Sequence, residues 1–66
     1  MTKVVLERSE NLQIHSEVVE YQGKTGLDLR TKYRKGNDWL RGKGVRIPIE
    51  HAEKFLTDTL EMLRNN

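Results

Sequence analysis

The chain has 66 residues, a net charge of +2 and no cysteine. A domain of this size buries only about 60% of the surface that its unfolded chain exposes, and without cysteine neither a disulfide nor a cysteine-ligated zinc can supplement the small core. We therefore expect one domain, residues 1–66, that is stabilised by self-association and needs no cofactor or metal. The sequence has no membrane span or signal peptide, so we expect the protein to be cytoplasmic.

The first half of the chain predicts a series of β-strands. Residues 3–8 and 11–21 are rich in Val, Ile and Leu, with a short polar interruption at 9–11. Gly23 lies in a segment, 22–25, that predicts a tight hairpin turn. In the run that follows, Leu27 and Leu29 alternate with Asp28 and Arg30, which is the period of a half-buried strand.

The middle of the chain predicts a break and then a fourth strand. Residues 34–44 contain Gly36, Asn37, Asp38, Gly42 and Gly44, a density of turn formers that favours a loop or wide hairpin. Alternation resumes at 43–49, and Pro48 is expected to end this strand because proline cannot donate to a β-ladder.

The C-terminal segment predicts one amphipathic helix. From 50 to 63, apolar residues recur at spacings of three and four, and acidic residues near the start suit the helix dipole. The predicted fold class is therefore α+β, a curved four-stranded antiparallel sheet followed by a single C-terminal helix. Part of the apolar stripe exceeds what one small sheet covers, which predicts a homodimer interface formed by Phe55, Leu56, Leu60 and Leu63.

Charge is distributed unevenly along the sequence. Residues 24–46 contain eight basic and two acidic residues, whereas the remainder contains four basic and eight acidic residues. A basic segment between acidic ends indicates a polyanionic partner, although a solvated charged loop would have the same composition.

An enzyme is not expected. His15 and His51 lie far apart in the sequence, and neither belongs to a recognisable nucleophile or metal-ligand motif. The glycines of 36–44 do not have the spacing of a phosphate-binding loop.

Aromatic residues accompany the basic segment at Tyr21, Tyr33 and Trp39. Basic side chains neutralise phosphates, and exposed rings stack on unpaired bases, whose faces a duplex hides. The combination favours a single-stranded nucleic acid, with core packing as the alternative role of each ring.

Several short motifs together resemble one known family. The stretches "YQGKTGLDLR" and "YRKGNDWLRGKGVRI", followed by "EHAEKF", resemble in order and near-identical spacing the Positive Cofactor Four (PC4) family of single-stranded DNA-binding transcriptional coactivators. The resemblance implies a ββββα dimer with a groove for unpaired DNA, and a short bacterial or phage-type member because no Ser-rich or Lys-rich tail precedes the first strand.

The resemblance and the charge pattern together define the expected binding residues. They are Tyr21, Lys24, Arg30, Lys32, Tyr33, Arg34, Lys35, Trp39, Arg41 and Lys43. We expect sequence-nonspecific binding of single-stranded DNA in transcription, replication or recombination, in the nucleoid if the protein is bacterial. The alternatives are a single-stranded RNA chaperone and a structural adaptor that binds an acidic protein partner.

Overall fold

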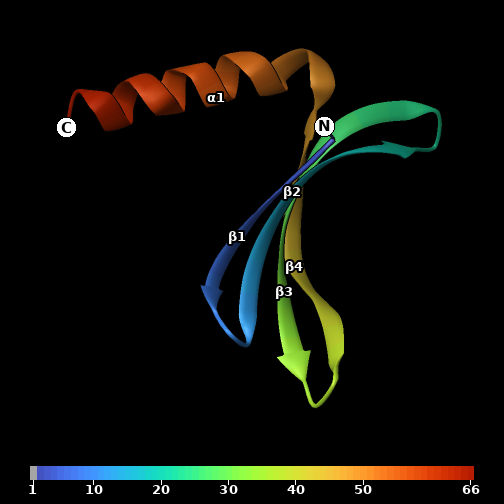
Figure 1. Ribbon diagram of the computed structural model, residues 1–66. Coiled ribbons are helices and arrows are strands. Elements are labelled where there is room, and N and C mark those ends of the chain that lie inside the picture. Colours follow the sequence, from blue (N-terminus) through green and yellow to red (C-terminus); the bar gives the residue numbers. More distant parts are fainter. Residues whose placement is uncertain (1) are drawn as a thin grey trace.

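The computed structural model describes residues 2–66 and has the order ββββα (Figure 1). The strands are β1 (Lys3–Ser9), β2 (Leu12–Tyr21), β3 (Lys24–Lys35) and β4 (Asp38–Pro48), and the helix is α1 (Ile49–Arg64). The strands pair in the order β1-β2-β3-β4, and each is antiparallel to its neighbour. The predicted fold class is confirmed, and the predicted helix, 50–63, is within one residue of α1 at each end.

The turn between β2 and β3 lies where the sequence predicts it. Gln22 and Gly23 form a two-residue connection with φ angles of 52° and 77°. Two consecutive positive φ angles are those of a type I′ turn, whose twist matches that of the flanking strands. The register that follows pairs Tyr21 with Lys24 and Glu17 with Asp28.

Of the two alternatives predicted for 34–44, a loop and a wide hairpin, the structure has a hairpin, with a tight turn in place of a wide one. β3 continues to Lys35 and β4 begins at Asp38, so that Gly36 and Asn37 alone form the turn. Gly42 and Gly44 lie inside β4, where they allow close approach of β3 rather than a change of chain direction. The basic segment is therefore part of a β-hairpin.

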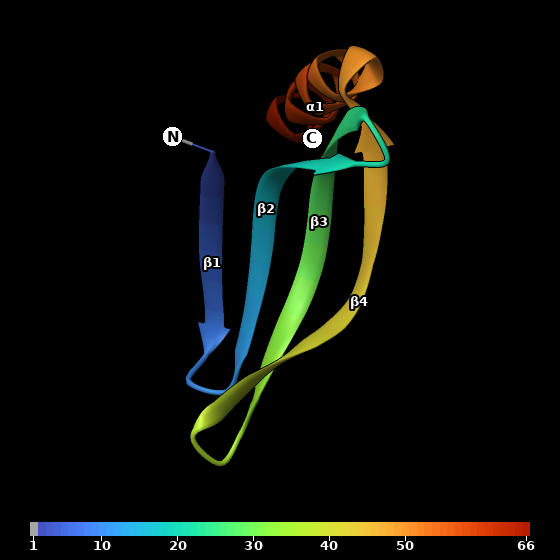
Figure 2. The same cartoon turned by 90° about the vertical axis from the view of Figure 1, so that its right-hand side faces the viewer.

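The sheet has two chemically different faces. The polar face is the side that carries Asp28, Arg30 and Lys32, and the apolar face is the side that carries Leu27 and Leu29. Seen nearly edge-on, the sheet is curved, α1 extends to one side of it and the tip of the β2–β3 hairpin bends to the other (Figure 1). Figure 2 shows the four strands side by side, with the bent hairpin near the junction of β4 and α1.

The core of the single chain is small. Leu27 and Ala52 are the buried hydrophobic residues of the described chain, and no side chain in residues 2–66 is fully buried. They lie where the first turn of α1 meets β3, and the rest of the helix extends away from the sheet (Figure 1). Within residues 2–66, α1 is neither long nor apolar enough to span a membrane.

Candidate nucleic-acid interface

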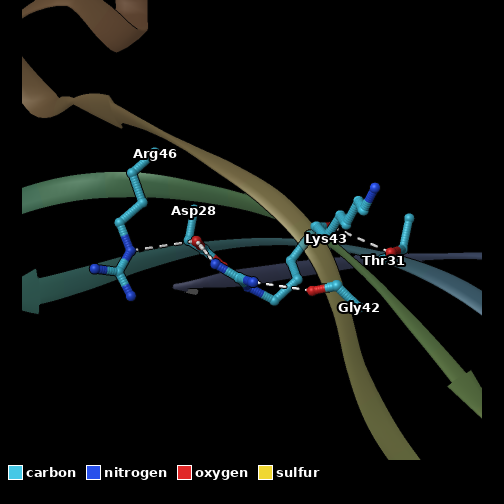
Figure 3. Close-up of polar contacts among 6 residues, drawn as sticks. Asp28, Thr31, Gly42, Lys43 and Arg46 are labelled. Carbon is cyan, nitrogen blue, oxygen red and sulfur yellow. Dashed lines mark hydrogen bonds and ion pairs between the residues drawn. The ribbon is translucent and has the colours of Figure 1, made fainter.

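An ionic network lies at the centre of the polar face. Asp28 accepts two hydrogen bonds from Arg30, each 3.0 Å, from Nε to Oδ2 and from Nη2 to Oδ1. Nη1 of Arg30 donates to the carbonyl oxygen of Gly42, also at 3.0 Å, so the guanidinium joins β3 to β4. Arg46 approaches Asp28 from the other side, with Nε 3.4 Å from Oδ1 (Figure 3).

These contacts keep the network charged. The hydrogen bonds from Arg30 hold the pKa of Asp28 below its ordinary value despite the opposing effect of burial. The same hydrogen bonds raise the pKa of the Arg30 guanidinium. One carboxylate therefore faces two guanidinium groups, and the network has a net positive charge.

A bulge in β4 makes room for Arg30. The β3–β4 register shifts between Arg30, which pairs with Gly44, and Lys32, which pairs with Arg41. Two residues of β4 thus lie opposite Thr31, whose hydroxyl donates to the carbonyl oxygen of Lys43 at 3.1 Å. The bulge turns the carbonyl of Gly42 toward the Arg30 guanidinium (Figure 3).

Arg46 also contacts an aromatic ring. Its guanidinium carbon lies 4.5 Å from the centre of the Tyr21 ring, within the range of a cation–π interaction. Tyr21 is 55% exposed despite this contact. Arg46 was not among the predicted binding residues. The alternation of Arg46 with Val45 and Ile47 places it on the polar face, but its contact with Tyr21 depends on the register of three strands.

Comparison with known proteins yields one informative structure. A PC4 homolog from Burkholderia pseudomallei superposes with a TM-score of 0.82 at 19% sequence identity, over 100% of this chain and 92% of that chain. The chain has a PC4-like fold. No protein-family model and no curated protein matches the sequence. The predicted resemblance is confirmed as a likeness of fold.

The PC4-like sheet brings most of the predicted binding residues to the polar face. Strand pairing places Tyr21 beside Lys24, Lys32 beside Arg41, and Arg34 beside Trp39. The members of this surface, which we call the basic strip, are Tyr21, Lys24, Arg30, Lys32, Arg34, Trp39, Arg41 and the additional Arg46. The strip runs along β3 and β4 from one hairpin turn to the other, with an aromatic ring at each end.

The availability of these side chains differs. Lys24, Arg34, Trp39 and Arg41 are exposed, whereas Lys32 is half-buried. Arg34 donates to the carbonyl oxygen of Gly36 in the adjacent turn. The Arg30 side chain is 17% exposed, and three of its N–H groups are already engaged. Arg30 therefore has a structural role, because its guanidinium bonds to Asp28 and Gly42, whereas most other cationic side chains of the strip are exposed to solvent.

Three predicted residues lie elsewhere in the PC4-like sheet. Tyr33 is on the apolar face, because the extra residue of the bulge belongs to β4 and the alternation of β3 is uninterrupted. Its ring is 44% exposed. Lys35, paired with Asp38 beside the turn, follows the same alternation. Lys43 lies in the bulge and lines a hollow on the apolar face with Ile14 and Leu29.

A larger hollow adjoins the basic strip and is lined by residues of the β2–β3 hairpin and of the junction between β4 and α1. Its volume is about 630 Å³, within the range of small-ligand pockets. Its lining includes Tyr21, Lys24 and Arg46, together with the apolar residues Val19 and Pro48.

His15 is a buried residue on the polar face of the sheet, where it pairs with Arg30. It is 8% exposed, its Nε2 lies 2.8 Å from Oε1 of Gln13, and its Nδ1 has no hydrogen-bond partner among residues 2–66. Burial lowers its pKa, the charges of Lys3 and Lys32 lower it further, and Glu17 acts in the opposite direction. Burial and the neighbouring lysines therefore favour the neutral form of His15 in the folded state.

Proposed function

We propose that the chain binds single-stranded DNA with little sequence preference, acts as a homodimer and catalyses no reaction. It would act in the cytoplasm, on DNA that transcription, replication or recombination has unpaired. The observation that carries the proposal is the basic strip, in which exposed cationic side chains lie between two exposed aromatic rings on one face of a curved sheet.

The composition of the strip supports a polymeric rather than a small ligand. The residues paired with Tyr21 and Trp39 are Lys24 and Arg34, ten positions apart in β3, so the rings are separated by at most about 33 Å along the strand. Cations between them can neutralise successive phosphates, and the rings can stack on bases at both ends. A duplex would offer phosphates to the same cations but would hide its base faces from the rings.

The exposed apolar residues support the homodimer. Phe55, Leu56, Leu60 and Leu63, the predicted interface residues, are between 43% and 61% exposed in the single chain. On the apolar face, Val4, Leu6 and Val45 are each 57% to 60% exposed. Large exposed apolar side chains in a domain with a very small core are typical of a protein interface.

The fold comparison supports the nucleic-acid partner. The structure that superposes on the whole chain is described as a PC4 homolog, and PC4 is the family that the sequence motifs resemble. Single-stranded RNA is the second candidate, because the same cations and rings would serve it, and discrimination would depend on contacts to the 2′-hydroxyl.

A binding comparison tests the proposal. Labelled single-stranded DNA, single-stranded RNA and duplex DNA of equal length are titrated with the protein at two salt concentrations. The proposal predicts tightest binding to the DNA single strand, with a logarithm of the association constant that decreases by about 0.7 per phosphate neutralised for each tenfold increase in salt concentration. Salt-independent binding, or the absence of binding to any of the three, would favour the adaptor that meets an acidic protein.

A further inference from the structure

The guanidinium of Arg46 is held between an aromatic ring and a carboxylate, an arrangement that phosphate binding alone would not require. The guanidinium lies over the ring at 4.5 Å, and its Nε is directed to Asp28 at 3.4 Å. Asp28 itself is 6% exposed and is fixed by two hydrogen bonds from Arg30. A buried, hydrogen-bonded carboxylate thus holds the guanidinium in place against the ring.

The second observation is the hollow beside this pair. Its volume of about 630 Å³ exceeds that of a nucleobase, and its wall includes Tyr21 and Arg46 together with the apolar surfaces of Val19 and Pro48. Arg46 lies over one face of the Tyr21 ring, yet the residue is 55% exposed, so Tyr21 remains accessible to a ligand in the hollow.

We propose that Arg46 is a positioning residue that fixes the Tyr21 ring for stacking on one unpaired nucleobase received in this hollow, and that Asp28 holds Arg46 in that position. The inference rests on the proposed function and names the part of the nucleic acid that the hollow receives. Stacking of a cation on one face of the ring immobilises it before the base arrives, so less side-chain entropy is lost on binding.

A charge-conserving substitution separates this role from phosphate binding. Arg46→Lys retains the positive charge but removes the planar group that lies on the ring. Arg8→Lys, on an exposed residue of β1, is the matched control. Both are compared with the unmodified protein by fluorescence anisotropy, using an oligothymidylate of about 20 nucleotides and a strand of equal length in which abasic tetrahydrofuran units replace all bases.

We expect Arg46→Lys to lower the affinity for oligothymidylate about 3- to 10-fold without changing the salt slope, and to leave the affinity for the abasic strand unchanged. Arg8→Lys should change neither. Equal losses on both strands, or no loss on either, would overturn the inference. If the unmodified protein binds neither strand, the proposed function itself fails, which is a different result.

A second substitution tests the role of Asp28. Asp28→Asn keeps the shape of the side chain but removes the charge that attracts Arg46, so the same base-dependent loss is expected. The double variant that also carries Arg46→Lys should lose no more affinity for oligothymidylate than either single variant, because both substitutions disrupt the same placement of Arg46 on the Tyr21 ring. Additive losses would contradict the role of Asp28. If Asp28→Asn does not fold, as judged by circular dichroism, the Arg46→Lys result alone decides the inference.

Discussion

Gly44 lies directly opposite Arg30, and a Cβ atom at position 44 would be 2.9 Å from the guanidinium carbon of Arg30 and 2.7 Å from the carbonyl oxygen of Leu29. The absence of a side chain at Gly44 is therefore what allows the Arg30 side chain to cross β4 and reach the carbonyl of Gly42.

Substitution of Gly44 should accordingly destabilise the sheet. Gly44→Ala forces the backbone of β3 or the Arg30 side chain to move, and we expect the free energy of unfolding to decrease by about 1–3 kcal/mol. Urea denaturation followed by circular dichroism measures it. Gly26→Ala is the control, because its Cβ would meet Ile47 at a less severe 3.2 Å and should cost less. Equal stability of the two variants would argue against the close packing at Gly44.

The depressed pKa of Asp28 predicts an acid-sensitive contribution to stability. The folded state binds this proton more weakly than the unfolded state, whose aspartate pKa is about 3.9. The contribution is complete above that value and is lost as the pH decreases through the folded-state pKa. In urea unfolding between about pH 6 and pH 2.5, the stability difference between the unmodified protein and Asp28→Asn should narrow as the pH decreases. Asp58→Asn, in an exposed ion pair with Lys54, should have little effect on stability.

The lowered pKa of His15 predicts a second pH dependence of stability, nearer neutral pH. Its folded-state pKa is lowered, so unfolding takes up a proton and stability decreases as the pH falls below the unfolded value of about 6.5. His15→Gln should remove this component between about pH 7.5 and 5, as measured by thermal unfolding. His51→Gln, on an exposed residue of α1, should leave it intact. An unchanged pH profile in His15→Gln would show that His15 is free to protonate in the folded state.

Removal of the Tyr21 ring should weaken binding to single strands selectively. Tyr21→Ala is expected to cost about 1–3 kcal/mol in oligothymidylate binding and to change weak duplex binding little, because a duplex presents no base face. Trp39→Ala should behave similarly, since this ring is 40% exposed at the other end of the basic strip. Tyr21→Phe is the control, since it keeps the ring and should be nearly silent. An equal loss on single and double strands would indicate that Tyr21 is a structural residue.

The exposed stripe of α1 should mediate self-association. In sedimentation equilibrium at micromolar concentration, the unmodified protein is expected to have the mass of two chains and Leu60→Glu that of one, because a buried carboxylate in an apolar interface is strongly unfavourable. Lys54→Glu introduces the same residue on the side of the helix that carries Asp58 and should leave the dimer intact. A single-chain mass for the unmodified protein would contradict the predicted interface.

Sequence periodicity predicted the fold better than it predicted the site. Alternation of Leu27 and Leu29 with Asp28 and Arg30 was sufficient to assign β3 and its two faces, because side chains in a strand have a period of two. The turn-forming composition gave a wrong prediction at Gly42 and Gly44. Glycine occurs both in turns and inside strands where a neighbouring strand approaches closely, and the sequence alone does not distinguish the two. Arg46 was missed because cross-strand register, rather than local sequence, brings it to Tyr21 and Asp28.

The strand order β1-β2-β3-β4 also has a consequence for folding kinetics. Every strand pairs with its neighbour in the sequence, so each ladder closes through a short turn and no strand waits for a distant partner. An individual hairpin forms in about 1–10 μs, which is far faster than the synthesis of the next few residues. The basic strip lies entirely within residues 21–46, so its assembly requires only the β2–β3 and β3–β4 ladders.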